Sequence, residues 1–217
     1  MNHEHVLVLG AGGHAKVVIE LLRASGRVVG AIIDADPRPR ELLGVPVVGG
    51  DERLEALRRE GFAQAFVAVG DNHLRQKIAR QVQAAGYRLV NALSPAAVLS
   101  PSAQVGVGVA LMAGAVVNAE ARIGDLAIVN TGARIDHDCV LGEACHAGPG
   151  AALAGGVEVG PLAFLGVGAC VIPQIRIGAA AIVGAGACVT RDILPRTVAM
   201  GAPARAIRTL AAEETLR

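Results

Sequence analysis

Short apolar runs alternate with longer segments of helical periodicity up to about residue 95. The apolar runs predict buried strands, and these lie at Val6–Leu9, Val28–Ile33, Ala65–Val69 and Tyr87–Val90. The segments with helical spacing lie at Ala15–Ser25, Glu52–Glu60 and Leu74–Ala85. Pro37 and Pro39 predict a loop after the second of the predicted strands. Alternating strands and helices predict a parallel sheet with crossover helices, a small Rossmann-like α/β domain.

The periodicity changes at Leu99, where an aliphatic or alanine begins to recur at every sixth position as far as Val189. A small or β-branched residue usually follows four places later, and glycine often follows directly. Neither a helix nor an ordinary strand has this period, whereas a hexapeptide β-helix does. We expect three hexads to close a triangular coil, with the aliphatic inside, the small residue at the corner and glycine easing the turn. Coils would stack at the ~4.8 Å strand spacing.

These patterns predict three parts: an α/β domain over 1–95, a parallel β-helix over 96–205 and a tail over 206–217. The tail is expected to be a short helix or disordered. In the β-helix, Cys139 and Cys145 fall in the small corner position and are interpreted as core. Cys170 and Cys188 are 18 residues apart and should stack in adjacent coils.

Composition excludes several classes of protein. The 217 residues carry a net charge of +1 and 2% aromatics, which argues against nucleic-acid binding and base stacking. No apolar run approaches the ~20 residues of a membrane helix. The N-terminus has no basic n-region of a signal peptide. Four cysteines without a CxxC pair indicate reduced thiols and no metal site, so we expect a cytoplasmic protein without membrane insertion.

His137 is the main candidate for chemistry in the β-helix. It stands between Ile135 and Cys139, which both point inward, so it should face outward. One coil away on either side lie Ala119 and Gly155, whose small side chains would leave a groove for a thin ligand. A near-neutral imidazole suits a general base. Either Asp136 or Asp138 could orient its ring.

The turn Gly10–Ala15 follows the first strand and fits the pattern GxGxxA, and Asp34 ends the second strand. That combination resembles a dinucleotide-binding signature. However, the N-terminal half contains only about one mononucleotide-binding unit. A nucleotide-sugar site is therefore the more economical interpretation, with the amides of Gly12 and Gly13 facing a polar or anionic ligand.

Four motifs together resemble one family, and they are Gly-Ala-Gly-Gly-His-Ala-Lys-Val (10–17), Val-Gly-Asp-Asn-His-Leu-Arg (69–75), Asn-Thr-Gly-Ala (130–133) and Asp-His-Asp-Cys (136–139). The chain is similar to bacterial sugar O- and N-acetyltransferases of the sialic acid O-acetyltransferase type. Within them it most resembles the N-acetyltransferases of nucleotide-linked 4-amino sugars, GDP-perosamine-like or UDP-linked. The resemblance implies a left-handed β-helix, a homotrimer, acetyl-CoA as donor, a nucleotide-sugar acceptor and a role in polysaccharide biosynthesis.

The resemblance also implies roles for individual residues. His137 would be the base, Asp138 the residue that orients it, and Asn130 a polar group near the reacting amine. The acetyl-CoA site would contain His146, Val167 and Ala185. The acceptor site would contain Gly12, Gly13, His14, Asp34 and Gly70. We add Arg75 as a candidate for pyrophosphate. The family often has a second acid after the first, but here Ala35 follows Asp34, which weakens the match on nucleotide identity.

The expected mechanism is direct attack of the sugar amine on the thioester, without a metal or an acyl-enzyme. Flat apolar faces of an isolated prism favour a trimer, with Leu126, Ile128 and Phe164 as candidate contacts. Three alternatives stay open at this point: O-acetylation of sialic acid or another sugar, a non-catalytic sugar-nucleotide-binding scaffold, and an NAD-dependent oxidoreductase.

Overall fold

The computed structural model describes residues 5–36 and 40–211, and the predicted loop at Pro37 and Pro39 lies outside them. The chain divides into two compact units, residues 1–95 and 96–217. Within the described ranges, no helix combines the length and the apolar character needed to cross a bilayer.

The first unit contains a parallel sheet of order β2-β1-β5-β6, as the alternation predicts. Its strands are β1 (Val6–Leu9), β2 (Val29–Ile33), β5 (Gln64–Val67) and β6 (Arg88–Leu89). Its helices are α1 (Gly13–Ala24), the 3-10 turn η1 (Asp51–Arg53), α2 (Leu54–Arg59) and α3 (Asn72–Ala84), and a short strand β7 (Ala92–Leu93) ends the unit. All four residues of β1 are buried, because this strand lies inside the sheet.

A small antiparallel hairpin in this unit was not predicted. It pairs β3 (Glu41–Leu42) with β4 (Val45–Pro46). Leu43 and Gly44 connect the strands with φ values of 51° and 76°, as a two-residue hairpin turn requires. Two-residue strands are too short to show a period-2 alternation, so the hydrophobic pattern could not reveal them.

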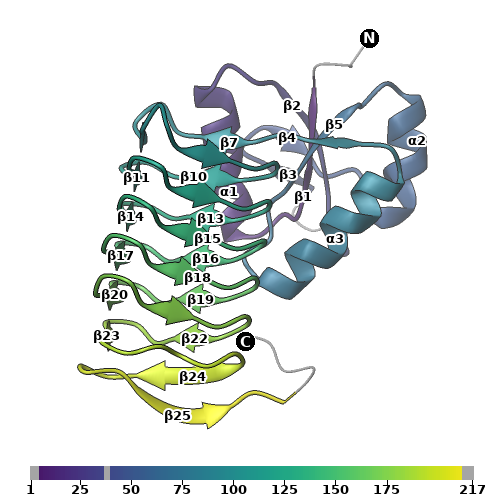
Figure 1. Ribbon diagram of the computed structural model, residues 1–217. Coiled ribbons are helices and arrows are strands. Elements are labelled where there is room, and N and C mark those ends of the chain that lie inside the picture. Colours follow the sequence, from purple (N-terminus) through teal and green to yellow (C-terminus); the bar gives the residue numbers. More distant parts are fainter. Residues whose placement is uncertain (1–4, 37–39, 212–217) are drawn as a thin grey trace. The chain divides into compact units, whose positions relative to one another are not determined.

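The second unit is a parallel β-helix, in which sixteen two-residue strands follow the predicted six-residue register. They are β8 (Val98–Leu99), β9 (Gln104–Val105), β10 (Ala110–Leu111), β11 (Val116–Val117), β12 (Arg122–Ile123), β13 (Ile128–Val129), β14 (Arg134–Ile135), β15 (Val140–Leu141), β16 (His146–Ala147), β17 (Ala152–Leu153), β18 (Glu158–Val159), β19 (Phe164–Leu165), β20 (Cys170–Val171), β21 (Arg176–Ile177), β22 (Ile182–Val183) and β23 (Cys188–Val189). Figure 1 shows their coils stacked from teal to yellow.

Every third strand pairs in parallel, 18 residues apart, so the coils form three sheets. We name each sheet by a strand. The β8 sheet contains β8, β11, β14, β17, β20 and β23; the β9 sheet contains β9, β12, β15, β18 and β21; the β10 sheet contains β10, β13, β16, β19 and β22. The predicted stacking of Cys170 on Cys188 is confirmed, since they are register partners.

The core of the β-helix consists of the predicted inward positions. The aliphatics from Leu111 to Val189 are nearly inaccessible, and so are the corner residues, including Cys139 and Cys145 at 0% exposure. The cysteines therefore pack as core residues, as expected.

The glycines that follow the aliphatics have a different role from the predicted one. They do not adopt a positive φ; that conformation recurs two residues later, for example at Gly168 and Asp138. A Cβ on Gly166 would lie 2.5 Å from the backbone nitrogen of Ala185. Glycine is therefore required at these positions because the next coil approaches too closely for a side chain.

The chain after the hexads also differs from its prediction. Strand β24 (Thr197–Met200) continues the β10 sheet, and β25 (Arg205–Thr209) pairs with it in antiparallel orientation. Residues 206–209 thus belong to a strand and not to a helical or disordered tail, while 212–217 lie outside the described residues. Backbone pairing to the preceding coil gives this polar segment its order.

Candidate active site

His137 lies at the corner between the β8 and β9 sheets, two residues after β14, and its side chain is 61% exposed as predicted. Its ring lies over Gly155 of the next coil. A Cβ added to Gly155 would come within 2.5 Å of Cε1 and 2.6 Å of Nε2. The absence of a side chain at Gly155 therefore creates the space that the imidazole occupies.

Asp138 orients this ring. Its Oδ2 lies 2.7 Å from His137 Nδ1, so Nε2 is the nitrogen left to face a substrate. The carboxylate raises the pKa of His137, mainly through this hydrogen bond and further through the charge of Asp136. Asp138 has a φ of 59°, a conformation that aspartate tolerates better than most residues. An imidazole held by a carboxylate in this way can accept a proton at Nε2.

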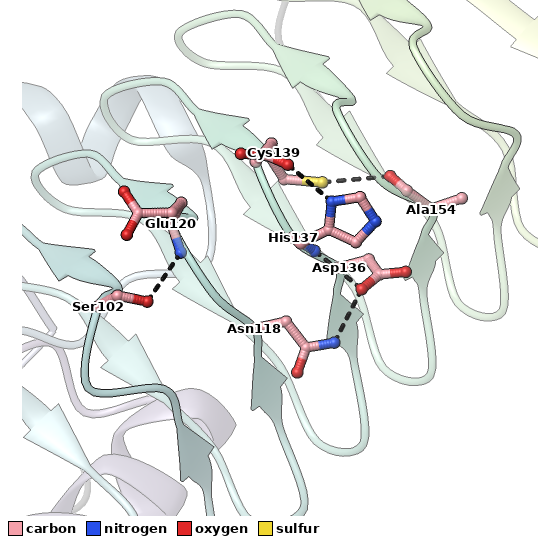
Figure 2. A network of polar contacts seen from close by, with 8 residues as sticks. Ser102, Asn118, Glu120, Asp136, His137, Cys139 and Ala154 are labelled. Carbon is pink, nitrogen blue, oxygen red and sulfur yellow. Dashed lines mark hydrogen bonds and ion pairs between the residues drawn. The ribbon is translucent and has the colours of Figure 1, made fainter.

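Asp136 fixes the backbone at the same corner. Its Oδ1 accepts hydrogen bonds from the backbone N–H of His137 and from Nδ2 of Asn118, both at 2.8 Å. These bonds lower the pKa of Asp136, that of Asn118 having the largest effect. Figure 2 shows the chain of contacts from Asn118 through Asp136 to His137. Asn118 was missed from the sequence, although its place 18 residues before Asp136 is the signal that identifies it.

An open groove of about 360 Å³ lies on the outer face of the β8 sheet beside this corner. Its lining comes from four successive strands and the residues that follow them: Val116, Asn118, Arg134, Asp136, Ala152, Leu153, Ala154, Cys170 and Val171. Cys139 donates from its Sγ to the Ala154 carbonyl at 3.2 Å, and burial raises the pKa of the Cys139 thiol.

Asn130 and His146 form a second group, on the β10 sheet. Asn130 Nδ2 lies 3.0 Å from His146 Nε2, and Phe164 packs edge-on against the His146 ring with centroids 5.1 Å apart. His146 is only 8% exposed. Packing by Phe164 and hydrogen bonding by Asn130 account for its burial.

Leu126 and Ile128 were predicted to be outward trimer contacts, but they are 4% and 1% exposed in the single chain. They are therefore unavailable for that role. Phe164, which packs on His146, is partly accessible.

Val167 and Ala185 stack at the corner between the β10 and β8 sheets, and both are exposed. The carbonyl of Val167 accepts from the N–H of Gly186 at 2.8 Å. In the part of the chain that the structure describes, the N–H groups of Val167 and Ala185 have no backbone acceptor. These amides can therefore donate to a ligand that runs along the stack.

The candidate residues of the β-helix thus occupy two different corners of the coil. Asn130 and His137 lie on opposite sides of β14, the strand of the β8 sheet that stands between them in the chain. Within one chain, the His137 group and the Asn130–His146 group therefore lie on different sides of the coil.

The first unit presents a separate candidate site at the carboxyl ends of β1 and β5. The sheet order reverses between these strands, and such a switch point is where α/β sheets bind ligands. A Cβ on Gly12, Gly13 or Gly70 would meet no atom within 4 Å, whereas one on Gly10 would lie 2.9 Å from the Ala68 carbonyl oxygen. Packing thus explains Gly10 but not the other three, which leave the edge open to a ligand.

Asp34 lines a cavity of about 220 Å³ at this edge, together with residues of α3. Its Oδ2 accepts from the N–H of Ala11 at 2.6 Å and its Oδ1 from that of Asp36 at 2.8 Å. His14 is half-buried on the first turn of α1. Its pKa is lowered to about 4, first by burial and then by the positive charge of Arg75, so it is neutral at pH 7.

Arg75 was predicted to face a ligand, but its side chain is not accessible to one. It is 1% exposed, and its guanidinium donates to the carbonyls of Val69 and Gly70 and to Asn72 Oδ1. It therefore holds the loop that presents Gly70. Among the described residues, no three His, Cys, Asp or Glu side chains group as a metal ion would require.

Comparison with known families and structures gives a consistent result. Residues 5–82 match the model of the PglD N-terminal domain. A mutant of perosamine N-acetyltransferase from Caulobacter crescentus, solved in complex with CoA and GDP-perosamine, is 59% identical and superposes with a TM-score of 0.92, covering 93% of this chain and 96% of that one.

Two further relatives are more distant. The acetyltransferase domain of PglB from Neisseria gonorrhoeae, solved with acetyl coenzyme A, is 40% identical with a TM-score of 0.88, over 94% of this chain and all of that one. UDP-N-acetylbacillosamine N-acetyltransferase of Bacillus subtilis is 40% identical over 112 residues, which are 51% of this chain and 52% of that relative. The chain thus matches about half the length of this curated relative.

Proposed function

Because the chain belongs to the hexapeptide-repeat sugar N-acetyltransferase family that includes perosamine N-acetyltransferase and the PglD-type enzymes, we propose that it acetylates an amino group of a nucleotide-linked amino sugar. Acetyl-CoA is the donor. The observation that carries the proposal is the His137–Asp138 pair at 2.7 Å, with the imidazole seated over Gly155. A groove beside an oriented base provides what transfer to an amine needs.

The proposed reaction is one direct step. The sugar amine attacks the thioester carbonyl, the new C–N bond forms, the C–S bond breaks, and CoA leaves. His137 Nε2 accepts the amine proton, and Asp138 stabilises the imidazolium through Nδ1. Cys139 does not act as a nucleophile in this step, because it is buried and the pKa of its thiol is raised.

The first unit is assigned to the nucleotide of the acceptor. Gly12 and Gly13 open helix α1, where backbone N–H groups and the helix dipole favour anionic groups. The missing Cβ atoms at Gly12, Gly13 and Gly70 support this assignment, because nothing in the chain itself requires glycine there. Neutral His14 supplies a ring nitrogen beside them, and Arg75 acts by positioning Gly70.

We further propose that the enzyme is a homotrimer in the cytoplasm, whose thiols are reduced. The separation of His137 from Asn130, His146 and Val167 supports an assembly, because a second copy would place its donor corner against His137. The Asn130–His146 pair then serves the thioester, and the amides of Val167 and Ala185 serve the pantetheine arm.

The test is a panel of GDP-, UDP- and CMP-linked amino sugars with acetyl-CoA, read by release of free thiol and by mass of the product. We expect turnover with at least one member. His137→Ala should lower kcat by about two to four orders of magnitude while acetyl-CoA and nucleotide still bind. A folded His137→Ala variant with near wild-type kcat would exclude this residue as the base.

O-acetylation of a sugar uses the same geometry, because a hydroxyl and an amine both lose a proton to His137. The three named relatives are N-acetyltransferases or acetyltransferase domains, which favours the amine. Including hydroxyl analogues of each amino sugar in the panel separates the two.

A further inference from the structure

The groove on the β8 sheet lies beside the corner that carries His137, because its lining includes the preceding residue Asp136. The imidazole of His137 lies over Gly155. A Cβ built on Gly155 would lie 2.5 Å from Cε1 and 2.6 Å from Nε2 of the ring. Ala154, the neighbour of Gly155, lines the groove together with Asp136. The groove lining therefore comes within one residue of His137 on one coil and of Gly155 on the next, and Figure 2 shows His137 together with Asp136 and Ala154.

The floor of the groove is hollow because its side chains are small. Ala152 and Ala154 stand on the outer face of the β17 coil, between Arg134 and Asp136 of the preceding coil and Cys170 of the next. A volume of about 360 Å³ lies at the lower end of small-molecule sites. It suits a single sugar ring rather than a whole nucleotide sugar.

The walls offer the polar contacts that a sugar needs. Both hydrogen bonds to Asp136 end on Oδ1, from Asn118 and from the His137 backbone. Its Oδ2 accepts from no residue within 5–36 or 40–211. This oxygen belongs to a residue on the groove wall and can accept from a sugar hydroxyl or from the protonated amine before reaction.

We propose that this groove is the subsite for the acceptor's sugar ring, with Ala152 and Ala154 as its floor and Asp136 Oδ2 as its polar anchor. The proposal rests on the proposed function and goes beyond it. It makes Ala154 a residue that determines which sugar fits, because it lies at the boundary between the ring and the base. It also assigns Asp136 a positioning role distinct from that of Asp138.

The test compares Ala154→Leu with wild type on GDP-perosamine, the sugar bound in the Caulobacter enzyme, or on whichever panel member the wild type turns over fastest. Leucine should fill the floor and lower kcat/KM for the sugar by 10-fold or more. The KM for acetyl-CoA and the Kd for the free nucleoside diphosphate should stay within twofold. Ala154→Val should give an intermediate effect, and Ala179→Leu, at an exposed turn between the β9 and β10 sheets, is the matched control.

A second measurement does not depend on turnover or on a variant that folds. Cys170 is an exposed thiol of the groove lining, whereas Cys139 and Cys145 are buried. The nucleotide sugar should slow alkylation of Cys170 by iodoacetamide, followed by mass spectrometry, and the nucleoside diphosphate alone should not.

Each other outcome overturns the subsite. Unchanged sugar kinetics in Ala154→Leu with unprotected Cys170 would place the sugar elsewhere. A raised KM for acetyl-CoA alone would make the groove a donor site. A change of oligomeric state in light scattering, with sugar protection lost, would make it a contact between copies. Failure of the proposed function itself is distinct, because then the wild type acetylates no member of the panel.

Discussion

Gly155→Ala is the sharpest test of the site, because it adds one carbon atom directly beneath the proposed base. The new Cβ would lie 2.5 Å from His137 Cε1, whereas ordinary contacts begin near 3.4 Å. The ring therefore has to move by about 1 Å, which breaks the alignment of Nε2 and strains the 2.7 Å bond to Asp138. A displacement of this size costs on the order of 10²-fold in rate. Folding should be little affected, because the His137 side chain is 61% exposed and can swing outward.

The assay measures kcat with saturating acetyl-CoA and acceptor in a double-mutant cycle with His137→Ala. We expect Gly155→Ala to lower kcat by about 100-fold in the wild type and to have almost no further effect when the ring is absent. Ala119→Gly is the control, since it changes the same corner one coil earlier. An equal loss in the His137→Ala background, or a melting temperature that falls with activity, would refute a mechanism acting through the ring.

Three further predictions concern pH and thiols. Wild-type kcat/KM should rise with pH through an apparent pKa above the ordinary 6.5 of histidine, since the base must be unprotonated and Asp138 raises its pKa; Asp138→Asn should shift that limb to lower pH, and an unshifted profile would contradict the assignment. The free energy of unfolding should fall by up to about 3 kcal/mol as the pH drops from about 6.5 towards 4. The reason is that His14 has a pKa of about 4 in the folded protein, so in this range it is neutral when folded and takes up a proton on unfolding. Denaturant titrations of His14→Gln should no longer show this pH dependence. Cys139→Ala should keep its turnover, measured by acetyl transfer, because this thiol is buried in the coil; a folded variant without activity would disprove direct transfer.

The β-helix was predictable because its period is imposed by the coil itself. Each hexad turns one corner of the coil and places one aliphatic side chain in the core. A spacing of six residues therefore predicts the strands, and a spacing of eighteen residues predicts which residues stack on one another in successive coils. That rule located Ala119 and Gly155 beside His137. It would also have found Asn118 above Asp136. Elements with no such repeat were missed, namely the hairpin β3–β4 and the antiparallel strand β25.

Contacts between residues that are not 18 positions apart could not be predicted from the sequence. Asn130 meets His146 across 16 positions, not 18, and only the direction of both side chains brings them together. Burial of His146 depends in part on the Phe164 ring. Arg75 looked like a ligand for pyrophosphate because arginine so often is one, but the loop carbonyls of Val69 and Gly70 take its donors instead.

The two acids that flank His137 show how the repeat itself assigns their roles. The position of Asp138 is left-handed in nearly every hexad, and glycine fills it at Gly132, Gly150 and Gly168. Asp138 accepts a backbone conformation that costs other residues roughly 1–2 kcal/mol, and its carboxylate reaches His137 Nδ1. Asp136 does not adopt a positive φ, and its carboxylate accepts hydrogen bonds from the His137 amide and from Asn118. Asp138 therefore orients the His137 ring, and Asp136 holds the backbone of His137. For this reason, replacing Asp138 should change the pH profile, whereas replacing Asp136 should change the KM for the sugar.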